Sequence, residues 1–263
     1  MPFTLAHPAV VLPLLRRPLV PSALVAGSLA PDLPYYVSLQ WLGGDYNLTL
    51  THERSSVLWL DPLIGAVLLA TFQLLLKRPV LALLPPSAAG RAAPAARGFR
   101  WRSPAALGLI AVSLVVGAAT HLVWDELTRA PGAPWALRLE VAFSVLGGAA
   151  LLWWLVRWWR ATPPQPVPDG VLLPRRPRTA LPALIGAVTV LAGAVAAALE
   201  LPEIRDAYQL GGAVDRVGVA EAELRTLLVE AGTAFIAALL VYAVGWHVHR
   251  AGTRRRAERV ARR

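Results

Sequence analysis

Five long apolar stretches, separated by polar segments, dominate the pattern of hydrophobic and polar positions along this chain. They cover approximately residues 57–76, 104–124, 139–156, 179–199 and 228–248. Each approaches the roughly 20 apolar residues that an α-helix needs to cross a bilayer core of about 30 Å. Runs of small residues such as GAVTVLAGAVAAA allow close helix packing in lipid. The pattern predicts an all-α protein, a polytopic transmembrane helical bundle with about five spanning helices.

Two shorter apolar runs, 8–16 and 21–30, precede the first long one. A helix of about ten residues is about 15 Å long, which is too short to cross a membrane. Pro18 and Pro21 divide the two runs, so they predict an N-terminal short helical hairpin. Such a hairpin returns the chain to its start and brings Asp32 close to His7.

Composition supports a membrane protein and excludes several kinds of site. Hydrophobic residues make up 56% and charged residues 16% of the 263 residues, whereas soluble domains are about a quarter charged. The absence of cysteine excludes disulfides, Cys-ligated zinc, iron–sulfur clusters and thiol nucleophiles. The chain has no GxSxG, P-loop or GxGxxG motif. Any metal site must therefore be built from His, Asp and Glu.

The connections between the apolar stretches alternate in charge. Segments 77–103 and 157–178 and the tail 250–263 are basic, whereas segments 125–140 and 200–230 are rich in acids. The positive-inside rule then places the basic connections and the tail in the cytoplasm of a cytoplasmic-membrane protein. The net charge of +10 is spread over separate loops rather than one groove with interleaved aromatics, so we expect membrane lipid and no nucleic acid as partner.

These features predict three regions. Residues 1–130 contain the candidate metal-site half, 131–249 contain three further membrane helices, and 250–263 form the basic cytoplasmic tail. Segments 77–103 and 157–178 are rich in Pro, Ala and Arg and lack an amphipathic period, so they are interpreted as mobile linkers.

His121 and Asp125, in THLVWDELT, are four residues apart, a spacing that places both side chains on one helix face. The pair suits two ligands of one metal, although an ordinary His–carboxylate pair at a membrane end has the same spacing. His52, in LTHERSS, lies on the same predicted outer side. Asp32, in APDLP, is either a further ligand or part of a proline-held turn. His7 would then be a ligand at the mouth of the hairpin.

Other ionisable residues fit this site less well. Asp61 lies in an apolar run, but DPLIGA also has the pattern of an N-cap followed by proline, and we favour the cap. His247 and His249 are two residues apart and lie on the predicted cytoplasmic side. Glu126 borders the HxxxD unit and is a candidate proton carrier, and Asp125 is a candidate catalytic residue as well as a ligand.

The four stretches MPFTLAHP, SLAPDLPY, LTHERSS and THLVWDELT together resemble the domain-of-unknown-function 4184 family of bacterial multi-pass proteins. Their order is also similar to that in inner-membrane metal-dependent hydrolases and, distantly, in zinc-dependent phospholipase C and the S1/P1 nucleases. The phospholipase resemblance implies Asp32, His52 and His121 around one metal, with Asp125 shared with a second ion that His7 binds. The downstream His and Glu residues of a third metal site are missing.

Such a centre would hold one or two divalent ions, with zinc the first candidate. It would hydrolyse a phospholipid-like or lipid-linked ester at the outer surface of the cytoplasmic membrane. Two other functions remain open. The same His and Asp residues can form a proton or ion relay in a non-catalytic membrane protein or transporter. They can also hold a purely structural metal with a closed coordination shell.

The predicted topology is testable by cysteine labelling. A cysteine that replaces Ala133, in an acidic connection, is expected to react with an impermeant thiol reagent added outside intact cells. A cysteine that replaces Ala92, in a basic connection, is expected to react only after the cells are permeabilised. The opposite labelling pattern would show that the predicted orientation in the membrane is wrong.

Overall fold

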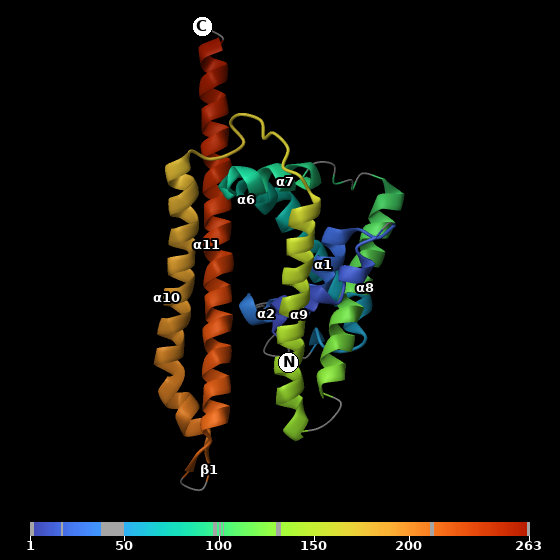
Figure 1. Ribbon diagram of the computed structural model, residues 1–263, viewed down its shortest axis with the longest axis vertical. Coiled ribbons are helices and arrows are strands. Elements are labelled where there is room, and N and C mark those ends of the chain that lie inside the picture. Colours follow the sequence, from blue (N-terminus) through green and yellow to red (C-terminus); the bar gives the residue numbers. More distant parts are fainter. Residues whose placement is uncertain are drawn as a thin grey trace. The chain divides into compact units, whose positions relative to one another are not determined.

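The computed structural model describes residues 3–16, 18–37, 50–96, 99, 101, 103–129, 133–210 and 213–261, and it is helical almost throughout (Figure 1). Five of the described helical segments are long and apolar enough to span a membrane: Leu60–Leu83, Pro104–Thr128, Arg138–Ala161, Arg175–Ala207 and Arg216–Thr253. The predicted all-α class with five spanning helices is therefore confirmed. Each segment extends beyond its predicted apolar run at one or both ends.

The chain forms two compact units. The first comprises Met1–Leu74 and Gly90–Pro166, and the second comprises Leu75–Ala89 and Val167–Arg263. The boundary near Leu74 falls in a π-helical turn, Thr71–Leu76 (η4), which joins α5 (Leu60–Ala70) to α6 (Lys77–Leu83). The three regions expected from the sequence, 1–130, 131–249 and 250–263, were defined by their expected roles rather than by packing, and they stay a prediction.

The N-terminal region of the first unit contains short helical pieces. Two 3₁₀ helices, η1 (Thr4–Ala9) and η2 (Leu12–Leu14), precede α1 (Pro21–Leu29) and the short α2 (Leu33–Tyr36). Residues 8–16 are thus not one α-helix as predicted, because Pro8 and Pro13 lack the N–H groups that would continue it. Pro21 begins α1, where a missing N–H costs nothing. The chain reverses as expected, and η1 packs against α1.

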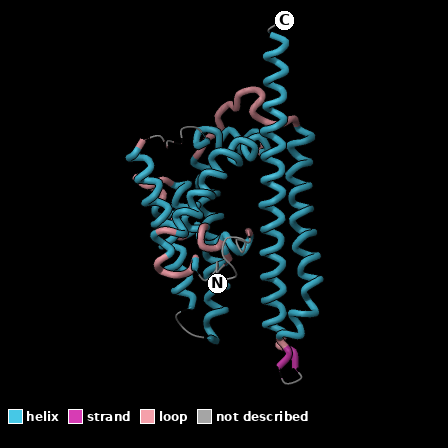
Figure 2. Tube along the Cα trace, turned by 180° about the vertical axis from the view of Figure 1, so that it is seen from behind, coloured by secondary structure: helices cyan, strands magenta, loops and turns pink. Residues whose placement is uncertain are grey.

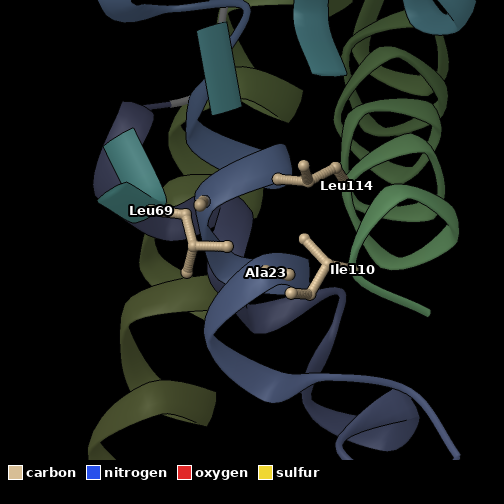
Figure 3. Packing of buried hydrophobic residues seen from close by; sticks show 5 residues of the cluster. Ala23, Leu69, Ile110 and Leu114 are labelled. Carbon is tan, nitrogen blue, oxygen red and sulfur yellow. The ribbon is translucent and has the colours of Figure 1, made fainter. Parts of the chain in front are cut away.

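Helix α1 packs against both α5 and α8 (Pro104–Arg129). Ala23 of α1, Leu69 of α5, and Ile110 and Leu114 of α8 point toward one another in a buried apolar cluster (Figure 3). Glycine permits the closest approach, since a Cβ on Gly117 would collide with the Leu24 carbonyl oxygen. The backbones of α1 and α8 are therefore in direct contact, as at small-residue interfaces in lipid.

Part of the segment expected to be a mobile linker, 77–103, is helical. It contains α6 and α7 (Pro86–Ala96). Alanine has the highest helix propensity, and Pro86 is tolerated at the first helical position. The linker prediction was therefore wrong for residues 77–83 and 86–96. In the other predicted linker, α9 (Ala133–Ala161) continues to Ala161 before irregular chain begins.

The second unit is built on a long helical hairpin. Helices α10 (Arg175–Ala207) and α11 (Arg216–Ala261) lie side by side (Figures 1 and 2). The connection at one end of the two helices contains the two-residue strands β1 (Gln209–Leu210) and β2 (Ala213–Val214), which pair antiparallel. Helix α6 packs on both long helices, and the Tyr242 hydroxyl donates to the Pro79 carbonyl at 2.9 Å.

The contact at Gly117 predicts opposite effects for two glycine-to-alanine substitutions on α8. Gly117→Ala forces α1 and α8 apart and is expected to destabilise the protein by about 1–3 kcal/mol. Gly108→Ala adds a Cβ with no atom within 4 Å, so the gain in helix propensity should stabilise it by up to about 1 kcal/mol. Thermal unfolding in detergent compares the two, and equal effects would contradict the close α1–α8 contact.

Candidate metal centre

Five polar side chains from four segments of the first unit meet in its interior. His7 lies on η1, Asp32 directly precedes α2, His52 lies in the turn before η3 (Ser56–Leu58), and His121 and Asp125 lie one turn apart on α8. Four of these side chains are at most 3% exposed, and the side chain of His52 is 9% exposed. All five residues predicted as metal ligands are therefore together. Their role as ligands stays a prediction.

The three imidazoles surround the two carboxylates. His7 Nε2 lies 3.1 Å from Asp125 Oδ1, and His52 Nε2 lies 3.4 Å from Asp32 Oδ1 and 3.5 Å from Asp125 Oδ2. His121 Nε2 lies 3.4 Å from Asp32 Oδ1 and 3.8 Å from Asp125 Oδ2. The His7 and His121 rings stack with centroids 3.8 Å apart. One small volume thus contains three ring nitrogens and four carboxylate oxygens.

Backbone carbonyls orient two of the rings. His121 Nδ1 lies 2.8 Å from the Ser28 carbonyl oxygen, and His7 Nδ1 lies 3.2 Å from the Thr4 carbonyl oxygen. A carbonyl only accepts, so both Nδ1 atoms must donate, and in the neutral rings the lone pair is on Nε2. These lone pairs point at the carboxylates, which offer no proton when ionised. A proton or a metal ion placed between the Nε2 lone pairs and the carboxylate oxygens removes the repulsion between these electron-rich atoms.

Two groups of these residues have a geometry that can hold a metal ion. They are His7, His121 and Asp125, and Asp32, His52 and His121, with the ligand atoms of each group within 4.8 Å of one another. His121 Nε2 belongs to both groups; it is buried and forms no hydrogen bond within the described part of the chain. Histidine nitrogens and carboxylate oxygens oriented by backbone carbonyls are a suitable donor set for a divalent transition metal. The residues present therefore fit a metal ion.

The electrostatics of Asp32 are consistent with positive charge at the centre. Burial alone would raise the pKa of Asp32, but the adjacent imidazoles of His121 and His52 outweigh burial and hold that pKa well below its ordinary value. Asp32 is therefore an ionised carboxylate at neutral pH. Without a metal ion, its negative charge requires an N–H donor or another positive charge beside it.

The other candidates from the sequence lie elsewhere. Glu126 points away from the cluster, with its side chain 66% exposed and its carboxylate 3.8 Å from Arg54; its role as a proton carrier stays a prediction. His247 lies within 3.0 Å of the Leu75 carbonyl oxygen, in the second unit. The N-cap interpretation of Asp61 was wrong, because α5 begins at Leu60 and Asp61 lies inside its first turn without a capping hydrogen bond.

The structure adds two groups that the sequence did not indicate, the carbonyls of Thr4 and Ser28. Both are backbone atoms, so no residue type in the sequence marks them. The Thr4 carbonyl lies three residues before His7 in η1, whereas the Ser28 carbonyl reaches His121 through the packing of α1 against α8. Ser56, whose hydroxyl lies 2.7 Å from Asp61 Oδ2, was likewise not singled out.

The charge state of Asp32 predicts a pH-dependent effect of Asp32→Asn on the metal-free protein. Because the folded state lowers its pKa, the stabilisation by Asp32 is complete above about pH 4 and is lost as the pH falls toward the folded-state pKa. At pH 7 the variant should be less stable by about 3 kcal/mol, and the difference should shrink below pH 4.

Thermal unfolding of both proteins between pH 3 and pH 8 tests this expectation. Glu126→Gln, which neutralises an exposed acid beside the cluster, is the control and should change little. A difference between wild type and Asp32→Asn that grows on acidification would contradict the assigned ionised state.

Comparison with known proteins gives one match. No curated protein and no solved structure matches the sequence. The family described as Domain of unknown function (DUF4184) matches residues 1–138, more than half of the 263 residues. This range includes His7, Asp32, His52, His121 and Asp125, and it ends near the beginning of α9. The chain therefore belongs to the DUF4184 family, and its candidate metal centre lies within the region that defines this family.

Proposed function

We propose that this protein is a membrane-embedded metal-dependent hydrolase whose site faces the outer side of the cytoplasmic membrane and acts on phospholipid-like or lipid-linked esters. One observation carries the proposal. Three imidazoles and two carboxylates converge in the interior, and two of the rings are held by backbone carbonyls with Nε2 toward the carboxylates. A cluster that only filled space would not need imidazole nitrogens held in a fixed orientation toward carboxylates, whereas a metal site does.

One or two divalent ions, with zinc the first candidate, would supply an acidified water molecule and a positive charge for a phosphoryl or acyl oxygen. The protein's own groups have separate tasks. Asp125 is adjacent to both His7 and His52, so its two oxygens can serve both halves of the centre. Glu126 follows it in the chain and reaches solvent, where it can exchange a proton with bulk water.

The position of the centre along the spanning helices favours hydrolysis over a relay across the membrane. Asp125 is three residues and His121 seven residues from Thr128, where the second spanning segment ends. At 1.5 Å per residue these positions are about 5 and 10 Å from that end. His52 precedes Leu60, where the first spanning segment begins. The five residues are thus gathered at one end of these segments, and the positive-inside rule favours the outer side for this end.

The surroundings of the centre support a lipid-like substrate. His52 is its least buried member, so a substrate reaches the centre from the His52 side. Leu58 and Trp59, shortly after His52, are 76% and 57% exposed. These apolar side chains can contact acyl chains while an ester group lies at the metal centre.

A structural metal is the second candidate, and the burial of four of the five side chains favours it. The two functions differ in whether a coordination position is open. Cobalt(II) substituted into the protein distinguishes them. A visible absorption spectrum that changes on addition of inorganic phosphate indicates an open position and hydrolysis. A spectrum that does not respond to phosphate indicates a closed, structural site.

Metal content is the first test. Wild-type protein purified in detergent is expected to contain one or two divalent ions per chain by elemental mass spectrometry. His121→Ala should lose most of this metal, because His121 belongs to both candidate groups, and Asp125→Ala should lose it as well.

His249→Ala is the matched control, since it removes an exposed histidine of the second unit and should keep the metal. All variants are compared at equal monodispersity. A wild type that stays metal-free after incubation with zinc, manganese and iron(II) would overturn the proposed function.

A further inference from the structure

Asp61 is a fully buried carboxyl group that the proposed chemistry does not use. It lies in the first turn of α5, inside an apolar spanning segment, and its relative exposure is 0%. Oδ2 contacts the Ser56 hydroxyl at 2.7 Å, whereas Oδ1 is buried and has no hydrogen bond to any described residue. An ionisable group in such a place is costly, and it is usually kept for function.

Ser56 connects Asp61 to the turn that carries His52. Its hydroxyl oxygen lies 2.7 Å from the Glu53 carbonyl oxygen and 3.3 Å from the Thr51 carbonyl oxygen as well. Thr51 is 1% exposed and directly precedes His52. The hydroxyl has one proton and donates to one of these acceptors at a time. The buried Ser56 side chain therefore lies in direct contact with both the turn around His52 and the first turn of α5.

The turn needs such support because it has little regular structure. From Thr51 to Ser55 it consists of turns and bends, with the backbone bonds Glu53 N to Leu50 O and Ser56 N to Glu53 O. The other four residues of the cluster lie on, or directly next to, helices. His52 is also the most exposed of the five. Its position is thus the one that depends most on groups outside the cluster.

We propose that Asp61 is a positioning residue of the metal centre, which fixes the turn around His52 through the Ser56 hydroxyl. The inference rests on the proposed function, because its effect is exerted on a metal ligand. Asp61 is close enough to His52 and His121 for their charges to interact. The hydrogen bond to Ser56, rather than this charge, carries the proposed effect, because it is a direct contact between α5 and the turn.

A merely structural role would give a different result. Leucine has a similar size, and Asp61→Leu would remove the buried Oδ1 that has no hydrogen bond. The Ser56 hydroxyl would still have the Glu53 carbonyl as acceptor. If Asp61 only packed, Asp61→Leu would be neutral or stabilising and would leave metal affinity unchanged. A positioning role predicts that metal affinity falls although stability does not.

The test measures zinc affinity of the full-length protein in detergent by competition with a chelator, together with thermal unfolding of the metal-free form. Asp61→Leu and Ser56→Ala should each weaken zinc binding 10- to 100-fold, as for other residues that orient metal ligands. Asp61→Asn keeps both the shape and a hydrogen-bonding partner for Ser56, so it should retain the wild-type affinity. Ser113→Ala is the control, because Ser113 is a buried serine of α8 that bonds the Val20 N–H and the Leu109 carbonyl.

Each alternative outcome has a distinct meaning. Wild-type affinity in Asp61→Leu would overturn the inference and leave the proposed function intact. A loss in Asp61→Asn as large as in Asp61→Leu would also overturn it, since negative charge and not the hydrogen bond would then be the cause. A similar loss in Ser113→Ala would attribute the effect to general destabilisation. Wild-type protein that binds no zinc would overturn the proposed function, and the inference with it.

Discussion

Two carboxylates in the interior of a membrane protein require compensation, and the first unit is organised around this requirement. Asp32 and Asp125 are almost fully buried and share three imidazole neighbours. Two anions this close to one another in a low-dielectric interior are unfavourable unless positive charge lies between them. The imidazoles can supply it as protonated rings, or they can hold a metal ion that supplies it.

The same requirement links helix packing to the tautomers of the histidines. Gly117 and Gly27 allow the backbones of α8 and α1 to touch, and a Cβ at Gly117 would also collide with the Ser28 nitrogen. At this distance the Ser28 carbonyl accepts a hydrogen bond from His121 Nδ1. A small-residue contact, common in membrane proteins for packing alone, therefore also fixes which nitrogen of His121 faces the carboxylates. The stability of the α1–α8 pair and the orientation of the His121 ring depend on the same contact.

The two units contribute unequally to the candidate site. Every member of the cluster lies in the first unit, within the residues that match the family. The second unit is a helical hairpin of two long apolar helices with small residues such as Gly193 at their contact. Among the described residues, neither of the two groups that can hold a metal ion lies in this second unit. The candidate metal centre thus lies in the part of the chain that matches the family, and the hairpin contributes two of the helices long and apolar enough to span a membrane.

Local sequence determined the spanning helices and part of the candidate site. Long apolar runs specify membrane helices without reference to the rest of the chain, and the four-residue spacing of His121 and Asp125 specifies a shared helix face. Local signals were misleading at residues 77–83 and 86–96, which are helical rather than a mobile linker, and at Asp61, which resembled a cap. Only the tertiary structure decided that His7, Asp32 and His52 reach the α8 pair, because their approach depends on backbone contacts between α1 and α8. It also decided the orientation of the His121 ring, since the Ser28 carbonyl belongs to another helix and a backbone carbonyl, common to all residue types, leaves no trace in the sequence.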